Sequence, residues 1–156
     1  MDNLTPPTAT GTPFDRAMMQ RCLQLARQGI GKTSPNPLVG AVVVQNGKIV
    51  GEGYHPGIGQ PHAEVFALGE AGEKAKGGTL YVNLEPCNHY GRTPPCSEAV
   101  IQAGIKKVVI GMADPNATAS GGKQRLEAAG ISVLVGVEEK ACCELNAGFI
   151  HRILYQ

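Results

Sequence analysis

Three residues able to bind a metal stand at the ends of expected helices and strands. His62 opens an apolar helical pattern, Cys87 follows a strand-like run, and Cys96 comes directly after Pro94-Pro95. One imidazole and two thiolates are a natural ligand set for catalytic zinc, which keeps a fourth position for water, whereas structural zinc normally takes four protein ligands. The sequence therefore predicts one Zn²⁺ per chain, held by His62, Cys87 and Cys96.

Glu64, two residues after His62, is the candidate catalytic residue. At this spacing on a helix the two side chains point in different directions, so Glu64 is not expected to be a further ligand. A carboxylate beside the metal can carry protons from water to a ring nitrogen and then to a leaving amine. Zinc deaminases combine H-x-E with P-C-x-x-C in this way, with the glutamate outside the metal shell. We therefore expect hydrolytic deamination.

Each of these residues also has an ordinary explanation. A His-x-Glu triplet is common by chance, and a single cysteine is usually a small buried hydrophobe. The joint occurrence of His62, Glu64, Cys87 and Cys96 at element boundaries is much harder to reach by chance. A structural zinc site and a chain without metal remain as the alternatives.

Composition narrows the class of protein. A chain of 156 residues fits one domain. A net charge of +1 and 4% aromatic residues argue against a nucleic-acid partner. No apolar run approaches the roughly 20 residues that cross a membrane. The odd count of five cysteines and the lack of a signal peptide predict a reducing, cytoplasmic location. Cys22 and at least one of the Cys142-Cys143 pair are expected in the core.

The expected elements alternate between helices and strands after a Thr- and Pro-rich leader at 1–13, within one domain at 14–156. The predicted helices run from Phe14 to Gly29, from Pro61 to about Lys76, from Pro94 or Pro95 to Gly104, from Gln124 to Ala129 and from Glu138 to Leu154. The predicted strands are Leu38 to Val44, Lys48 to Tyr54, Thr79 to Leu84, Lys107 to Met112 and Ile131 to Val135. Asn46-Gly47 predicts a hairpin between the first two strands. This order indicates an α/β fold, a mixed sheet with helices on both faces.

Residues 79–98, TLYVNLEPCNHYGRTPPCSE, resemble the pyrimidine deaminases of riboflavin biosynthesis, usually the N-terminal domain of a bifunctional deaminase–reductase. The distinguishing feature is the eight residues between the two cysteines. Further matches lie at 34–40, 53–55 and 114–116. The resemblance implies a cytidine deaminase-like three-layer α/β/α sandwich with a five-stranded mixed sheet. It implies conversion of 2,5-diamino-6-ribosylamino-4(3H)-pyrimidinone 5′-phosphate to 5-amino-6-(5-phosphoribosylamino)uracil and ammonia.

The resemblance also assigns site residues. It implies the zinc ligands and the proton shuttle named above, and it implies substrate contacts at Asn36, His55, Arg92 and Asn116. His89 is an additional candidate. An arginine at position 92 offers a planar fork for a phosphate group. For each of these contacts, an ordinary turn or surface residue is the alternative.

The sequence departs from the family pattern in two places. Residues 117–123, ATASGGK, replace the family's usual proline and Gly-basic-Gly stretch. The chain also stops where the reductase domain would begin, so it is either a stand-alone deaminase or a truncated protein, with a separate reductase as a possible partner. Relatives suggest a homodimer or homotetramer. The rival functions are deamination of another base or nucleotide, of the cytidine, dCMP or guanine type, and a non-catalytic zinc-binding interaction domain.

Overall fold

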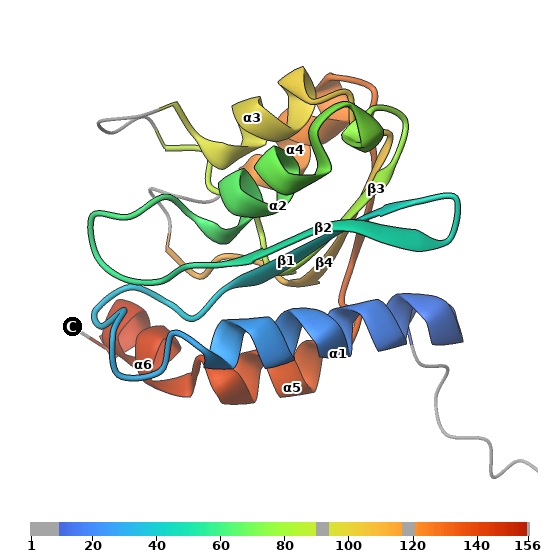
Figure 1. Cartoon of the computed structure of the whole chain (residues 1–156). Helices are drawn as coiled ribbons and strands as arrows, with labels where there is room; N and C mark the ends of the chain where they lie inside the picture. The colour runs from blue at the N-terminus through green and yellow to red at the C-terminus, as the bar shows by residue number, and fades with distance from the viewer. Residues whose placement is uncertain (1–9, 90–93, 117–120, 156) are drawn as a thin grey trace, which may run out of the picture.

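A computed structural model describes residues 10–89, 94–116 and 121–155. It holds a five-stranded sheet with the strand order β2-β1-β3-β4-β5 (Figure 1). The strands are β1 (Gly40–Gln45), β2 (Lys48–Tyr54), β3 (Thr79–Leu84), β4 (Lys107–Met112) and β5 (Ser132–Val135). β1 runs antiparallel to both β2 and β3, while β4 and β5 run parallel to β3. The predicted mixed sheet is confirmed.

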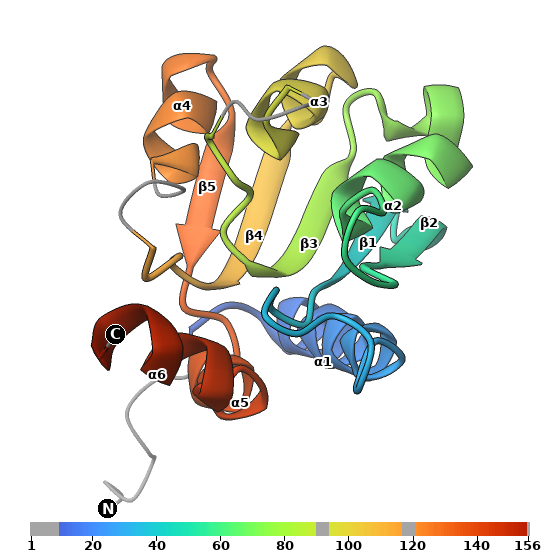
Figure 2. The ribbon, with the colours of Figure 1, turned by 90° about the vertical axis from the view of Figure 1, so that its left-hand side faces the viewer.

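Helices cover both faces of this sheet. One layer holds α1 (Pro13–Arg27), α5 (Glu139–Leu145) and α6 (Ala147–Tyr155) (Figure 1). The other layer holds α2 (Ala63–Ala71), α3 (Cys96–Gln102) and α4 (Gly122–Ala128), with the 3₁₀ turn η1 (Gly72–Ala75) following α2 (Figure 2). The three-layer α/β/α arrangement is therefore confirmed.

Two hydrophobic clusters form the core, one on each side of the sheet. Val43 and Val82 pack with Ala67 in the α2 layer, and Val42 packs with Met19 in the α1 layer. Neighbouring strand residues point to opposite faces, so a central strand covered on both faces is mainly apolar. The central strands accordingly carry apolar runs, and the buried amide of Asn83 in β3 is a polar exception.

Glycines in β2 bring α2 unusually close to the sheet. A Cβ at Gly51 would overlap the carbonyl oxygen of Ala67, and one at Gly53 would lie 2.7 Å from the carbonyl oxygen of Ala63. Real Cβ atoms do not approach backbone this closely, so glycine is required at both positions. The close packing places the first turn of α2, with Glu64, over the sheet.

Two predicted helix starts are corrected. α2 begins at Ala63 rather than at Pro61, because His62 is extended, with ψ at 165°, and serves as the N-cap. The α-helix ends at Ala71, and the 3₁₀ turn η1 continues the helical segment to Ala75, close to the predicted end at Lys76. α1 starts at Pro13 because Thr12 forms a capping box with Asp15, so these residues belong to the folded domain and not to the leader.

The predicted terminal helix from Glu138 to Leu154 is in fact two helices separated by Asn146. The Oδ1 of Asn146 accepts the backbone N–H of Leu38 at 2.7 Å, and its Nδ2 donates to the Leu38 carbonyl at 2.8 Å. The side chain of Asn83 also bonds to this segment, at the Leu38 carbonyl and the Gly40 N–H. Side chains thus satisfy the backbone of Leu38, which explains why β1 begins at Gly40 and not at Leu38.

The remaining cysteines follow the prediction. Cys22 and Cys142 are fully buried, and Cys143 is half-buried. None of the helices in the described ranges combines the length and apolar character that a bilayer crossing requires.

Candidate active site

The three predicted metal ligands come together on the α2–α3 side of the sheet. His62 is the N-cap of α2, Cys87 lies just beyond the end of β3, and Cys96 is the first residue of α3. Their candidate ligand atoms all lie within 4.8 Å of one another. The Nδ1 of His62 is 3.2 Å from the Sγ of Cys96 and 3.9 Å from that of Cys87. Ligand atoms around one tetrahedral zinc lie about 3.5–3.8 Å apart, so the cluster fits this ion.

The surroundings of the two cysteines favour a thiolate at Cys87. The thiol and the backbone N–H of Cys96 both hydrogen bond to Cys87, the latter at 3.2 Å, and His62 adds a further bond. These contacts outweigh burial and lower the pKa of the Cys87 thiol to about 4, while the pKa of Cys96 is raised because its hydrogen is shared with Cys87. Metals bind the deprotonated form of cysteine, so Cys87 is already in the state that zinc needs.

Glu64 lies in the first turn of α2, beside the cluster. Its side chain is buried, and the residue is only 3% exposed. Burial raises the pKa of this carboxyl to about 7, against the opposing effect of His62. A group whose pKa lies near neutrality can both take up and release a proton under ordinary conditions.

A cavity of about 180 Å³ opens beside these groups. Its polar lining consists of Asn36, His55, His62, Glu64, Glu85, Cys87, Asp114 and Asn116. Its apolar lining consists of Pro37, Val39, Leu84 and Phe149. The structure thus brings three predicted substrate contacts, Asn36, His55 and Asn116, to the same cavity as Glu64.

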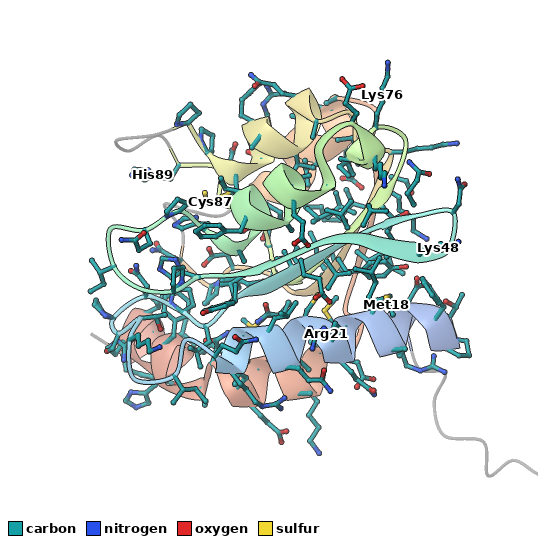
Figure 3. All side chains as sticks on the ribbon, in the orientation of Figure 1. Met18, Arg21, Lys48, Lys76, Cys87 and His89 are labelled. Atoms are coloured by element: carbon teal, nitrogen blue, oxygen red, sulfur yellow. The ribbon has the colours of Figure 1, made fainter. Side chains whose placement is uncertain are left out.

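The other two predicted contacts are placed differently. His89 is exposed and does not line the cavity, although it lies only two residues beyond Cys87 (Figure 3). Arg92 lies outside the described residues. Both assignments stay predictions.

Asn36 and His55 form a short hydrogen-bonded relay. The Nδ1 of His55 lies 3.2 Å from the carbonyl oxygen of Pro61, and its Nε2 lies 3.2 Å from the Nδ2 of Asn36. Because a carbonyl only accepts, Nδ1 carries the hydrogen and Nε2 accepts from the Asn36 amide. Burial lowers the pKa of His55, which keeps the ring neutral as this relay requires. The relay orients the Asn36 amide with its nitrogen toward His55.

Sequence reasoning assigned no role to six lining residues, among them Glu85, Asp114 and Phe149. Glu85 directly follows β3, and Asp114 lies two residues past the end of β4. Polar residues after the carboxyl ends of neighbouring parallel strands meet at one sheet edge, so this signal was available. Phe149 comes from α6, on the opposite helix layer, and no local pattern links it to the site.

Comparison with known proteins agrees with this geometry. The family described as the cytidine and deoxycytidylate deaminase zinc-binding region matches residues 12–112. The riboflavin biosynthesis protein RibD of Synechocystis sp. is 65% identical over 143 residues, which cover 91% of this chain and 39% of that protein. The diaminohydroxyphosphoribosylamino-pyrimidine deaminase of Buchnera aphidicola is 54% identical over 140 residues, which cover 89% of this chain and 95% of that protein.

A solved structure shows the same fold. It is a diaminohydroxyphosphoribosylaminopyrimidine deaminase/5-amino-6-(5-phosphoribosylamino)uracil reductase from Thermotoga maritima, 45% identical, with a TM-score of 0.87. The match covers 90% of this chain and 41% of that protein, so the chain spans about two fifths of the length of its bifunctional relative. On its sequence, its fold and its His-Cys-Cys cluster, the chain belongs to the zinc-dependent cytidine and deoxycytidylate deaminase family and, within it, to the pyrimidine deaminases of riboflavin biosynthesis.

Proposed function

We propose that this chain hydrolyses the 2-amino group of 2,5-diamino-6-ribosylamino-4(3H)-pyrimidinone 5′-phosphate and releases ammonia. The observation that carries the proposal is the convergence of His62, Cys87 and Cys96 beside a buried Glu64, at a cavity that also holds Asn36 and the other polar lining residues. The Buchnera relative, which the chain matches over nearly its whole length, bears the name of this activity.

His62, Cys87 and Cys96 would hold the zinc, which when bound supplies a Lewis acid that makes water a stronger nucleophile at neutral pH. Glu64 takes a proton from the attacking water while the water oxygen bonds to the ring carbon that carries the amino group. The carboxyl delivers this proton to the adjacent ring nitrogen. Glu64 then carries the second proton to the amine as the carbon–nitrogen bond breaks, and ammonia leaves.

The cavity walls select and orient the ring. The Asn36 amide, oriented by His55, supplies hydrogen-bonding groups for a ring edge or ribose. The Asn116 amide supplies such groups from the segment that follows β4. Apolar contact comes from Val39, Leu84 and Phe149. Arg92, on its resemblance to the family pattern, would bind the 5′-phosphate.

Ammonia release across a substrate panel tests the proposal. The panel contains the ribosylaminopyrimidine phosphate, cytidine, dCMP and guanine, and the zinc-loaded protein should act on the first. Turnover of cytidine, dCMP or guanine alone would reject the substrate and keep the reaction class. No turnover of any member by a protein with one zinc per chain would favour the interaction-domain alternative.

We further propose a homodimer or homotetramer in the cytoplasm, whose product passes to a reductase. Exposed apolar residues on α2, Val65 at 43% and Phe66 at 39%, support self-association. Cysteines without disulfides, in the part of the chain described, suit a reducing compartment. A reductase is the second activity in the name of the Thermotoga relative. Sedimentation that shows only monomer would contradict the assembly.

A further inference from the structure

We propose that Glu85 is a positioning residue, which holds the Asp114–Asn116 side of the cavity in the place where substrate needs it. The inference rests on the proposed function, because Asp114 and Asn116 matter here as walls of the substrate cavity. It gives a role to a glutamate that neither binds the metal cluster nor moves protons.

The two carboxylate oxygens of Glu85 hold two separate points of the chain. Oε1 accepts the backbone N–H of Asp114 at 3.0 Å, and Oε2 accepts the backbone N–H of Lys123 at 2.8 Å. The residue is only 7% exposed. Both oxygens thus accept from backbone amides, so Glu85 fixes the position of these two segments.

The hold on Asp114 extends to Asn116. The Oδ1 of Asp114 accepts the backbone N–H of Asn116 at 2.9 Å. Both residues line the cavity together with Glu64. A shift of the Asp114 backbone therefore moves two cavity residues at once.

A tight contact at Gly122 reinforces the hold on Lys123. A Cβ on Gly122 would overlap the carbonyl oxygen of Pro86, and it would lie 3.4 Å from the Cγ of Glu85. The first turn of α4 is thus pressed against the two residues that lead to Cys87. One short segment, Glu85-Pro86-Cys87, joins the metal cluster to the opposite side of the cavity.

The chemistry of the site calls for a carboxylate. A carboxylate accepts through both oxygens, whereas the amide of glutamine has one acceptor and one donor. Glu85→Gln would therefore turn an N–H group toward one of the two backbone N–H groups. A buried donor left without an acceptor is costly, so one side of the hold should open.

The test uses two variants that open the hold in different ways, on the full zinc-loaded chain. Glu85→Gln removes one acceptor, and Gly122→Ala adds only the clashing methyl group, since its φ is not left-handed. The matched controls are Glu144→Gln on the exposed surface of α5 and Gly69→Ala in α2, where no atom lies within 4 Å of the added Cβ. Steady-state kinetics, zinc content and amide hydrogen exchange are measured for all four.

Both test variants should keep zinc and most of kcat, raise KM about tenfold and speed exchange of the Asp114 or Lys123 amides, an effect of the size of one lost charge-assisted hydrogen bond. Neither control should change KM. Faster exchange without a rise in KM would overturn the inference, as would loss of zinc or of kcat at unchanged KM. If Gly122→Ala fails to fold, because its methyl group overlaps the backbone of Pro86, Glu85→Gln decides alone. If the wild-type protein deaminates a different substrate, the proposed function fails in its substrate, and the same comparison of KM is made on the substrate that is turned over.

Discussion

Glu64 owes its chemistry to where its side chain lies. An exposed glutamate would stay ionised at neutral pH, but burial beneath the first turn of α2 raises the pKa of this carboxyl to about 7. The neighbouring cluster acts the other way on Cys87, whose pKa falls to about 4 through hydrogen bonds from Cys96 and His62. Two acids in the lining of one cavity thereby differ in pKa, as their proposed roles in proton transfer and metal binding require.

Glu64→Gln should retain one zinc per chain and lose turnover by about 10²- to 10⁴-fold, because glutamine keeps the shape but cannot carry a proton. Metal analysis and ammonia release measure the two effects. Glu73→Gln, on the exposed surface of η1, is the control and should behave as wild type. Substantial turnover by Glu64→Gln would show that another group moves the protons.

At the scale of single elements, α1 depends on a buried acid at its first turn. Asp15 accepts from the backbone N–H of Thr12 and, at 2.7 Å, from the hydroxyl of Tyr81 in β3. Burial opposes the charged form, but these hydrogen bonds outweigh it and lower the pKa of Asp15 below its ordinary value of 3.8. The helix start is thus joined to the centre of the sheet by one carboxylate.

Asp15→Asn should lower the free energy of unfolding at pH 7 by about 1–2 kcal/mol, through a weaker cap and weaker hydrogen bonds. Since the folded pKa is depressed, the wild-type advantage is complete above the unfolded pKa and declines as pH falls through the folded pKa. Urea unfolding at pH 7 and near pH 3 should therefore show a smaller gap between variant and wild type in acid. Glu139→Gln, an exposed acid in the first turn of α5, is the control. An equal gap at both pH values would contradict the charge-based account.

One side chain also stabilises the break between α5 and α6. Asn146 is 3% exposed and pairs with both backbone groups of Leu38, in the segment that leads from Asn36 into β1. The break redirects α6, which then contributes Phe149 to the cavity. The C-terminal helices therefore take part in the site although they lie on the opposite layer.

Asn146→Ala should lower the free energy of unfolding by about 1–3 kcal/mol, because it leaves the buried N–H and C=O of Leu38 short of their partner. Urea denaturation measures this loss. Gln102→Ala, which removes an exposed amide at the end of α3, should change stability by no more than about 0.5 kcal/mol. Equal stability of the two variants would mean that Asn146 does not hold the break.

For the whole molecule, the metal cluster is a cross-link between distant parts of the chain. His62 and Cys96 are 34 residues apart and come from different helices, while Cys87 follows the central strand β3. A ligand that binds only the folded state stabilises it, by about 2.7 kcal/mol at a hundredfold excess over Kd. Zinc should therefore act on stability as well as on turnover.

Removal of zinc by a chelator should lower Tm by several degrees, since about 1 kcal/mol shifts Tm by roughly 2–4 °C in a domain of this size. Added zinc should restore both Tm and ammonia release. Differential scanning calorimetry with and without chelator gives the shift. The variant His62→Ala serves as the reference and should show no response to either treatment. An unchanged wild-type Tm in the presence of chelator would contradict the proposal that zinc cross-links the fold.

Elements and residues with local signals could be predicted from the sequence. β3 and β4 have the predicted bounds, because the apolar runs at 80–82 and 108–110 mark strands that are buried on both faces. The hairpin at Asn46-Gly47 follows equally from local chemistry, since both residues have positive φ values, 53° and 76°. The convergence of the three proposed metal ligands could also be predicted, because each stands at an element end within a distinctive spacing.

Features that join distant segments could be found only in the folded protein. The break at Asn146 depends on Leu38, 108 residues away, and the role of Glu85 depends on amides 29 and 38 residues away. A sequence pattern reports contacts within a turn or a strand, whereas these side chains are satisfied by backbone that the sheet and its helices bring near. The positions of the cavity walls thus depend on long-range packing, whereas the proposed reacting groups could be found from motifs and spacing in the sequence.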